Sequence, residues 1–257
     1  MMAASRMNCL DLTMPTPAEN LACDEALLDY CENGYEHEIL RFWEPQTYFA
    51  VVGYANRVAG EITQRACRAA NIPVLRRCSG GGTVLQGPGC LNYSLILKIA
   101  EDGPLRGIAS ANRFILERNR AALGTLPPPA GPRPEPPSAQ PQIMLQGHTD
   151  LSIGGRKFSG NAQRRKKCFL LFHGTFLLHF DLGLIEETLP LPSRQPEYRL
   201  NRAHADFLVN FAAPADSVKR VLRQAWRAFD PLECLPRDRI LLLSRDKYAT
   251  DGWNLKF

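Results

Sequence analysis

The chain has 257 residues, of which 45% are hydrophobic and 22% charged; these values are typical of a globular protein and exclude a disordered, collagen-like or coiled-coil chain. Its net charge of +5 suits an anionic small ligand or an acidic protein partner and is too weak to indicate nucleic-acid binding. No apolar run reaches the roughly 18 residues that span a bilayer, and no secretory signal is readable. The cysteines form no C-x-x-C pair, so we expect reduced thiols in a cytoplasmic protein that binds neither membrane nor nucleic acid.

The first half of the chain alternates helices and strands. Thr16 to Glu19 reads as a capping box with proline at the first helical position, which predicts a helix that ends at Gly34. Further helices are expected over 60–70 and 107–123, and strands over 39–43, 48–52, 74–77 and 91–98.

A proline-rich segment interrupts this pattern. Eight of the 20 prolines fall within 127–141, and because proline has no backbone N–H, that stretch cannot join a sheet or a helix interior. We expect an exposed loop inserted at about 125–142 into one catalytic domain that spans residues 1–257.

After the loop, Gly154-Gly155 predicts a hairpin turn between strands at 150–153 and 157–158. Strands are also expected over 169–172 and 175–180, and Asp216 is expected to cap a helix whose apolar face runs to Phe229. Without a regular βαβ alternation, the sequence predicts an α+β fold with mixed or antiparallel β-sheets flanked by helices.

The segment Arg76-Arg77-Cys78-Ser79-Gly80-Gly81-Gly82-Thr83-Val84 is the first candidate for chemistry. Three consecutive glycines after a strand allow backbone N–H groups to turn inward as an anion nest, and the two arginines supply permanent charge for a phosphate or carboxylate. The alternative is a glycine-rich loop with solvated arginines. The segment matches neither the Walker pattern nor the dinucleotide fingerprint.

Three further features have both a chemical and a structural interpretation. Lys157, on a strand before a turn of small residues, is either a point charge for a reacting carboxylate or phosphate, or a solvent-facing lysine. His173, before Gly174, is either an acid–base group or a packed histidine. The basic run 164–167 is either a solvated loop or a contact with an acidic partner protein.

Taken together and in order, these segments resemble the lipoate–protein ligase A family of the biotin/lipoate ligase superfamily. The matching stretches are 20–28, 76–95, 150–166, 173–182 and 247–257. The resemblance implies the catalytic-domain fold of that superfamily and an ATP- and Mg²⁺-dependent activation of lipoate or octanoate to acyl-AMP. It also implies acyl transfer to a lysine of a lipoyl carrier domain, of the 2-oxoacid dehydrogenase E2 or glycine-cleavage H protein type.

The resemblance also implies the roles of individual residues. Lys157 matches the catalytic lysine that contacts the acyl carboxylate and the phosphate, Arg77 matches a phosphate-side arginine, and Asp150 lies where the family has an acid near the nucleotide and its Mg²⁺. The other expected substrate- or nucleotide-binding residues are Ser79, Gly80, Gly81, Gly82, Thr83, Val84, Leu85, Gly160, Asn161 and Ala162. Strand residues such as Val52 or Tyr93 are expected to line an acyl tunnel.

Two alternatives stay open beside the ligase. Related octanoyl- and lipoyl-transferases use a catalytic cysteine either shortly before the stretch matching 150–153 or about two dozen residues after the HG strand, and this sequence has none at either place. A transferase would then use Cys168 or Cys90 and take its acyl group from a pre-acylated carrier protein; a non-catalytic lipoyl-binding relative is the other alternative.

Two departures from the ligases bear on this choice. Gln86 and Gly87 stand where the best-known ligases carry histidine and aspartate, which resembles the transferases. The match reaches Phe257 without a C-terminal accessory domain, so a separate accessory protein is expected if the chain activates free lipoate. Biotin as a substrate is disfavoured, because the glycine and lysine segments match the lipoate branch more closely.

Overall fold

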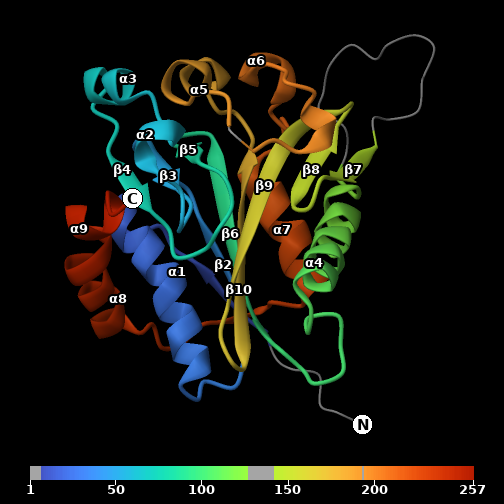
Figure 1. Ribbon diagram of the computed structural model, residues 1–257. Coiled ribbons are helices and arrows are strands. Elements are labelled where there is room, and N and C mark those ends of the chain that lie inside the picture. Colours follow the sequence, from blue (N-terminus) through green and yellow to red (C-terminus); the bar gives the residue numbers. More distant parts are fainter. Residues whose placement is uncertain (1–6, 127–141, 193) are drawn as a thin grey trace.

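The computed structural model describes residues 7–126, 142–192 and 194–257 (Figure 1). The predicted proline-rich loop at about 125–142 lies almost wholly outside these ranges, so it stays a prediction. No helix in the described part of the chain is long and apolar enough to cross a membrane.

Within the described residues, eight strands form a mixed sheet in the order β11-β1-β2-β6-β10-β9-β8-β7. These are β1 (Met7–Asp11), β2 (Glu38–Trp43), β6 (Cys90–Lys98), β7 (Ile143–Gln146), β8 (Asp150–Ile153), β9 (Arg156–Arg165), β10 (Phe169–Leu177) and β11 (Asp230–Pro231). Strand β1 is parallel to both neighbours, and the remaining pairs are antiparallel. A small second sheet has the order β4-β3-β5, from β3 (Phe49–Val52), β4 (Val74–Arg76) and β5 (Val84–Gln86).

Helices cover both faces of the large sheet (Figure 1). One face packs against α1 (Pro17–Glu32) and α8 (Arg237–Leu243), the other against α4 (Ile108–Leu123) and α7 (Ala215–Trp226). The shorter helices are α2 (Val58–Glu61), α3 (Gln64–Ala69), α5 (Leu182–Thr188), η1 (Glu197–Arg199), α6 (His204–Phe207), η2 (Ser244–Tyr248) and α9 (Asp251–Asn254). This arrangement confirms the predicted α+β fold of mixed sheet and flanking helices.

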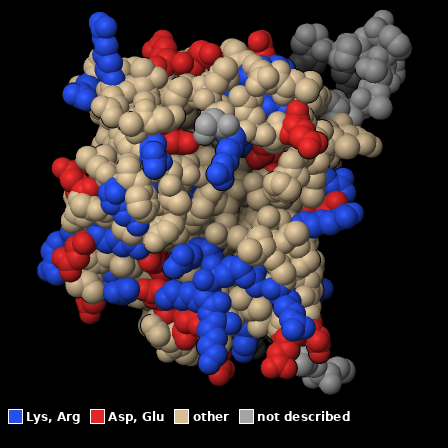
Figure 2. Space-filling model, viewed as in Figure 1, with Lys and Arg blue, Asp and Glu red and all other residues tan. Residues whose placement is uncertain are grey.

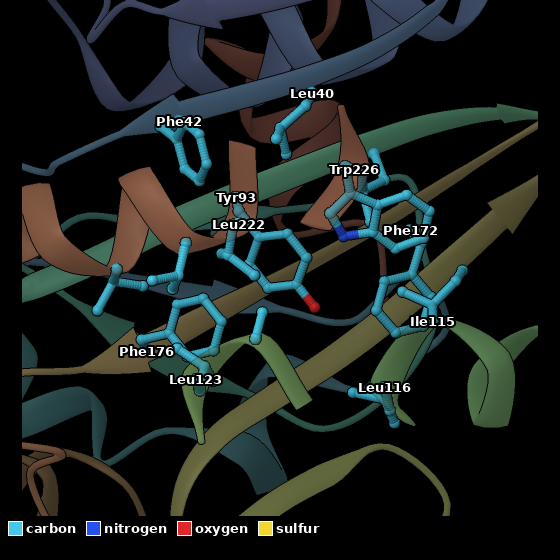
Figure 3. Packing of buried hydrophobic residues seen from close by; sticks show 14 of the residues in the cluster. Leu40, Phe42, Tyr93, Ile115, Leu116, Leu123, Phe172, Phe176, Leu222 and Trp226 are labelled. Atoms are coloured by element: carbon cyan, nitrogen blue, oxygen red, sulfur yellow. The ribbon is translucent and has the colours of Figure 1, made fainter. Parts of the chain in front are cut away.

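Strand β6 runs through the middle of the molecule and is buried on both faces. Leu91, Tyr93 and Leu95 point into the core formed with α4 and α7, where Tyr93 lies beside Phe176 and close to α7 (Figure 3). Ile96 points to the opposite face and packs in the core under α1. The strand predicted over 91–98 is therefore confirmed.

Two local predictions are confirmed in detail. The Thr16 hydroxyl accepts a hydrogen bond from the Glu19 N–H, and the Glu19 carboxylate accepts one from the Thr16 N–H, which completes the capping box that starts α1. Gly154 and Gly155 have φ of +57° and +73°, a left-handed turn that favours glycine and joins β8 to β9.

Three local predictions are wrong. Residues 60–70 form two short helices rather than one. Strand β10 continues through His173-Gly174 because this pair is hydrogen-bonded in register to β6 on one side and β9 on the other. Helix α7 starts after Pro214 without a side-chain cap from Asp216, and Phe229 lies beyond its end, 68% exposed.

Candidate active site

A pocket of about 910 Å³ lies between the glycine-rich loop, the strands β8 to β10 and the segment 185–208. The predicted site residues that line it are Lys157, Arg77, Gly81, Gly82, Thr83, Val84, Leu85, Asp150, Gly160, Asn161 and Ala162. Ser79 and Gly80 do not line it, although they belong to the same loop. Of the two expected tunnel residues, Tyr93 lines the pocket, whereas its wall on β3 is Val51 rather than Val52.

Lys157 presents the ammonium group of the pocket. Its Nζ lies 2.8 Å from Asp150 Oδ1, and its side chain is 25% exposed. The second carboxylate oxygen, Asp150 Oδ2, accepts a 2.8 Å hydrogen bond from the Tyr198 hydroxyl, whose pKa is raised by burial and by the Asp150 charge. The carboxylate therefore holds the Lys157 ammonium from one side, and the N–H groups on its other side are available to a ligand.

The donor set does not fit a resident metal ion. Both Asp150 oxygens are already engaged, one by Lys157 and one by Tyr198. In the ranges that the structure describes, no group of three or more His, Cys, Asp or Glu side chains is arranged to hold a metal. The expected role of Asp150 near a nucleotide-bound Mg²⁺ stays a prediction.

Arg77 holds the shape of the glycine-rich loop. Its guanidinium donates to the carbonyls of Gly80, Gly82 and Val51, with Nη2 at 2.6 and 2.7 Å from the two glycine oxygens. Burial lowers the pKa of Arg77 to about 10, which still leaves it protonated at neutral pH. These hydrogen bonds hold Arg77 to the loop and to β3, and its contact with a phosphate stays a prediction.

Arg76 is fully buried and likewise binds backbone. Its guanidinium donates to the carbonyl oxygens of Gly53, Tyr54, Asn56, Trp253 and Asn254. The arginine thereby ties the start of the glycine-rich segment to the C-terminal residues, an arrangement that the sequence pattern does not reveal.

A chain of polar contacts runs behind the loop. Ser79 Oγ lies 2.6 Å from His173 Nε2, and His173 Nδ1 lies 3.2 Å from Asp24 Oδ2. Burial favours the neutral form of Asp24, but the charge of buried Arg41, 2.6 Å away, and the bond to His173 outweigh it and lower the pKa of Asp24. Ser79 is 1% exposed and also accepts a hydrogen bond from Arg77, so this chain supports the loop rather than presenting a nucleophile.

All eight cysteines lie in the described part of the chain, and none lines the pocket. Cys90, at the start of β6, is 2% exposed, and burial raises the pKa of its thiol to about 12. Cys168 is exposed in the β9–β10 turn, at the opposite end of β10 from the pocket residues Gly174 and Thr175. Neither is placed to act as a pocket nucleophile.

Sequence analysis missed two groups of lining residues. The segment 185–208 supplies one wall, including Tyr198, Arg199, His204 and Phe207. It has no long periodic element that would have drawn attention to it. The second group is a closed hydrogen-bonded set that joins β5 of the small sheet to β6 and β10 of the large one: Gln86 donates to Thr175, Thr175 to Asn92, and Asn92 back to Gln86.

The family model described as "Lipoyl protein ligase A/B catalytic domain" matches residues 16–227. A curated relative from Geobacillus kaustophilus, octanoyltransferase LipM, is 29% identical, and the alignment covers 93% of this chain and 94% of the relative. A lipoate protein ligase from Thermoplasma acidophilum, solved in a study of an archaeal lipoylation system, has a similar fold, with a TM-score of 0.77, 23% identity and coverage of 98% of this chain and 97% of that one. The structure of a lipoate-protein ligase A bound with ATP is also similar, with a TM-score of 0.75, 23% identity and coverage of 98% of this chain and 99% of that one.

These comparisons confirm the resemblance and the fold and correct the predicted activity. At 23% identity the ligase structures establish the fold alone. The curated relatives that match more than nine-tenths of the chain are named octanoyltransferases, so the prediction of an ATP-dependent ligase is wrong. From the matched residues 16–227, the chain belongs to the lipoyl protein ligase A/B catalytic domain family.

Proposed function

We propose that this chain is an acyltransferase, which moves an octanoyl group from the thioester of a pre-acylated carrier protein to the ε-amine of a lysine on a lipoyl carrier domain. The name of the curated relatives supports the acyl group and the type of reaction. The observation in the structure that carries the proposal is the Lys157 ammonium, held by Asp150 inside a pocket with a mainly apolar lining.

The apolar lining suits a medium-length acyl chain. Leu21 from α1, Trp43 from β2, Val51 from β3 and Leu85 from β5 all contribute to the wall. Burying an aliphatic chain contributes roughly 0.8 kcal/mol for each CH₂ group. The acyl chain therefore supplies much of the binding free energy, and the polar groups orient its carbonyl.

Lys157 supplies the electrostatic part of the chemistry. When the acceptor amine attacks the thioester carbonyl carbon, negative charge builds on the carbonyl oxygen, and a fixed ammonium next to it stabilises the transition state. The C–S bond then breaks, the amine nitrogen loses its proton to the departing sulfur, and an amide and a free thiol remain. The acceptor amine itself is the nucleophile, which fits a pocket whose described lining contains no cysteine.

A thioester is already activated, so this reaction needs neither ATP, Mg²⁺ nor an accessory protein. A lipoyl group in place of octanoyl would be transferred by the same steps. An acceptor of the E2 or H protein type belongs to the same proposal. So does a cytoplasmic location, which the eight free thiols support because such thiols persist in a reducing compartment.

The test is incubation of the purified chain with an octanoyl-loaded acyl carrier protein and an apo lipoyl domain, without ATP. We expect intact-mass analysis to show one octanoyl group added to the domain. In the matched reaction, free octanoate, ATP and Mg²⁺ replace the loaded carrier, and we expect no modification. A domain modified only in the second reaction overturns the proposal, and a domain unmodified in both favours a non-catalytic relative.

A further inference from the structure

Three segments that are distant in the sequence bring an aromatic ring and two cations together beside the glycine-rich loop. The Tyr54 ring, after β3, is 39% exposed. Arg164 of β9 lies over it, with Cζ 5.9 Å from the ring centroid, and the Lys256 ammonium lies 4.0 Å from the same centroid. Lys256 also contacts the ring of Trp253, at 4.2 Å.

This cluster is attached directly to the pocket. The Tyr54 N–H donates a 2.9 Å hydrogen bond to the Ser79 carbonyl, and the neighbouring Asn56 side chain donates to the Gly81 carbonyl. Gly81 lines the pocket. Arg164 follows two residues after Ala162, which lines the pocket as well. The cluster therefore forms part of the rim on the side of the glycine-rich loop.

Among the described residues, no acidic side chain forms an ion pair with the cations of this rim. Figure 2 shows Lys and Arg gathered across this face below the level of the glycine-rich loop. Two neighbouring cations are paired: Lys166 lies 2.5 Å from Asp29, and Lys247 lies 2.6 Å from Glu25. Arg164 and Lys256, by contrast, have no acidic partner among the described residues, and both lie over aromatic rings.

The substrates of the proposed reaction differ in charge at this rim. The acceptor presents a lysine, which is an ammonium until it loses a proton to solvent and becomes the attacking amine, and two cations repel its charged form. The donor thioester hangs on a pantetheine arm joined to its carrier protein through a phosphodiester, which is an anion. A guanidinium and an ammonium flanking an exposed ring form a charge-assisted site for such a group.

We propose that Arg164 and Lys256, positioned by Tyr54, bind the phosphate of the donor's pantetheine arm and so select a phosphorylated thioester. This inference rests on the proposed function for the identity of the donor.

The test uses the full chain carrying R164A and K256A together, with K167A as the matched control. Lys167 belongs to the same basic run, is exposed, and lies outside the cluster. We expect the double variant to raise the KM for octanoyl-carrier protein about tenfold, as two partly exposed charge contacts together would. The kcat and the KM for the lipoyl domain stay unchanged, and K167A behaves as the wild type.

Three octanoyl donors distinguish binding of the phosphate from binding of the carrier protein. Octanoyl-coenzyme A carries the same arm without the carrier protein, and octanoyl-pantetheine lacks the phosphate. An increase in KM with both phosphorylated donors but not with octanoyl-pantetheine supports the inference. An equal increase with all three, or with the carrier protein alone, overturns it.

Binding of 4′-phosphopantetheine, measured by calorimetry, does not depend on turnover. Wild-type binding that is lost in the double variant supports the rim site even if no acyl transfer is observed, in which case the proposed function alone fails. No wild-type binding of this probe overturns the inference while leaving the proposed function standing.

Discussion

Lys157 keeps its ammonium in the pocket because its neighbour on β9 has no side chain. A Cβ at Gly160 would lie 2.8 Å from Lys157 Nζ, so any larger residue would push the ammonium out of place. The ion pair to Asp150 is partly exposed and contributes little to the stability of the fold. The residue is therefore expected to matter for the reaction and not for folding.

Lys157→Ala is expected to slow the reaction without destabilising the fold. Losing the ammonium that stabilises the oxyanion is expected to lower kcat by about 10²- to 10³-fold. The free energy of unfolding, from urea titration, is expected to stay close to the wild-type value. Lys167→Ala is the charge-matched control and should transfer octanoyl at the wild-type rate. A Lys157→Ala enzyme with near-normal kcat would show that another group activates the carbonyl.

Cys90 and Cys168 are the two thiols that a cysteine-dependent transfer would use. A variant with Cys90→Ala and Cys168→Ala is expected to keep the wild-type transfer rate, because neither thiol lines the pocket. Intact-mass analysis of the wild type with the loaded donor alone should show no acyl adduct on the enzyme. Such an adduct, or loss of transfer in the double variant, would contradict direct attack by the acceptor amine.

At the scale of elements, the pairing of β9 with β10 positions the polar side chains of the pocket. Gly174 of β10 pairs with Asn161 of β9, and a Cβ at Gly174 would lie 1.8 Å from Asn161 Oδ1. That oxygen accepts a 2.6 Å hydrogen bond from Tyr93 of β6, so one glycine allows a contact that spans three neighbouring strands.

We therefore predict that Gly174→Ala displaces Asn161, breaks its bond to Tyr93 and destabilises the fold by about 1–3 kcal/mol, as overpacking of a dense interior does. Urea unfolding measures the stability, and the transfer assay is expected to show a parallel loss of activity. Gly252→Ala is the control, since a Cβ there meets no atom within 4 Å. Equal stability of the two variants would contradict this packing argument.

At the scale of the molecule, one buried ion pair joins α1 to the large sheet behind the site. Arg41 of β2 is 0% exposed, lies 2.6 Å from Asp24 of α1, and also binds the carbonyls of Asn20 and Leu12. The lowered pKa of Asp24 means that the carboxylate stabilises the folded state above the ordinary aspartate pKa of about 3.9. This contribution is lost as the pH falls through the lower, folded-state value.

Asp24→Asn is accordingly expected to cost about 3–5 kcal/mol of unfolding free energy at pH 7, because it leaves Arg41 buried without a counter-charge. Urea titrations at pH 7 and below pH 4 provide the measurement. The difference in unfolding free energy between the wild type and the variant should be smaller in acid. Asp246→Asn, in an exposed ion pair, is the control and should match the wild type at both pH values. A gap that does not change with pH would show that the Asp24 charge is not what stabilises the fold.

The features that the sequence by itself determined are those whose signal lies within a few residues. The capping box at Thr16, the hairpin at Gly154-Gly155 and the strand β6 all follow from backbone geometry and side-chain period between near neighbours. Most of the site residues expected from the family motifs lie around the pocket, because each motif carries several of them on one continuous segment.

Tertiary structure alone decided which groups meet. The position of Arg77 before the loop suggests an anion-binding residue, whereas in the fold its Nη2 donates to the carbonyls of Gly80 and Gly82. Tyr198 reaches Asp150 across 48 residues, and Lys256 reaches Tyr54 across most of the chain. The physical reason is that hydrogen-bond donors are directional and finite: a residue type shows what a group can bind, but only the folded backbone determines which partner is within about 3 Å.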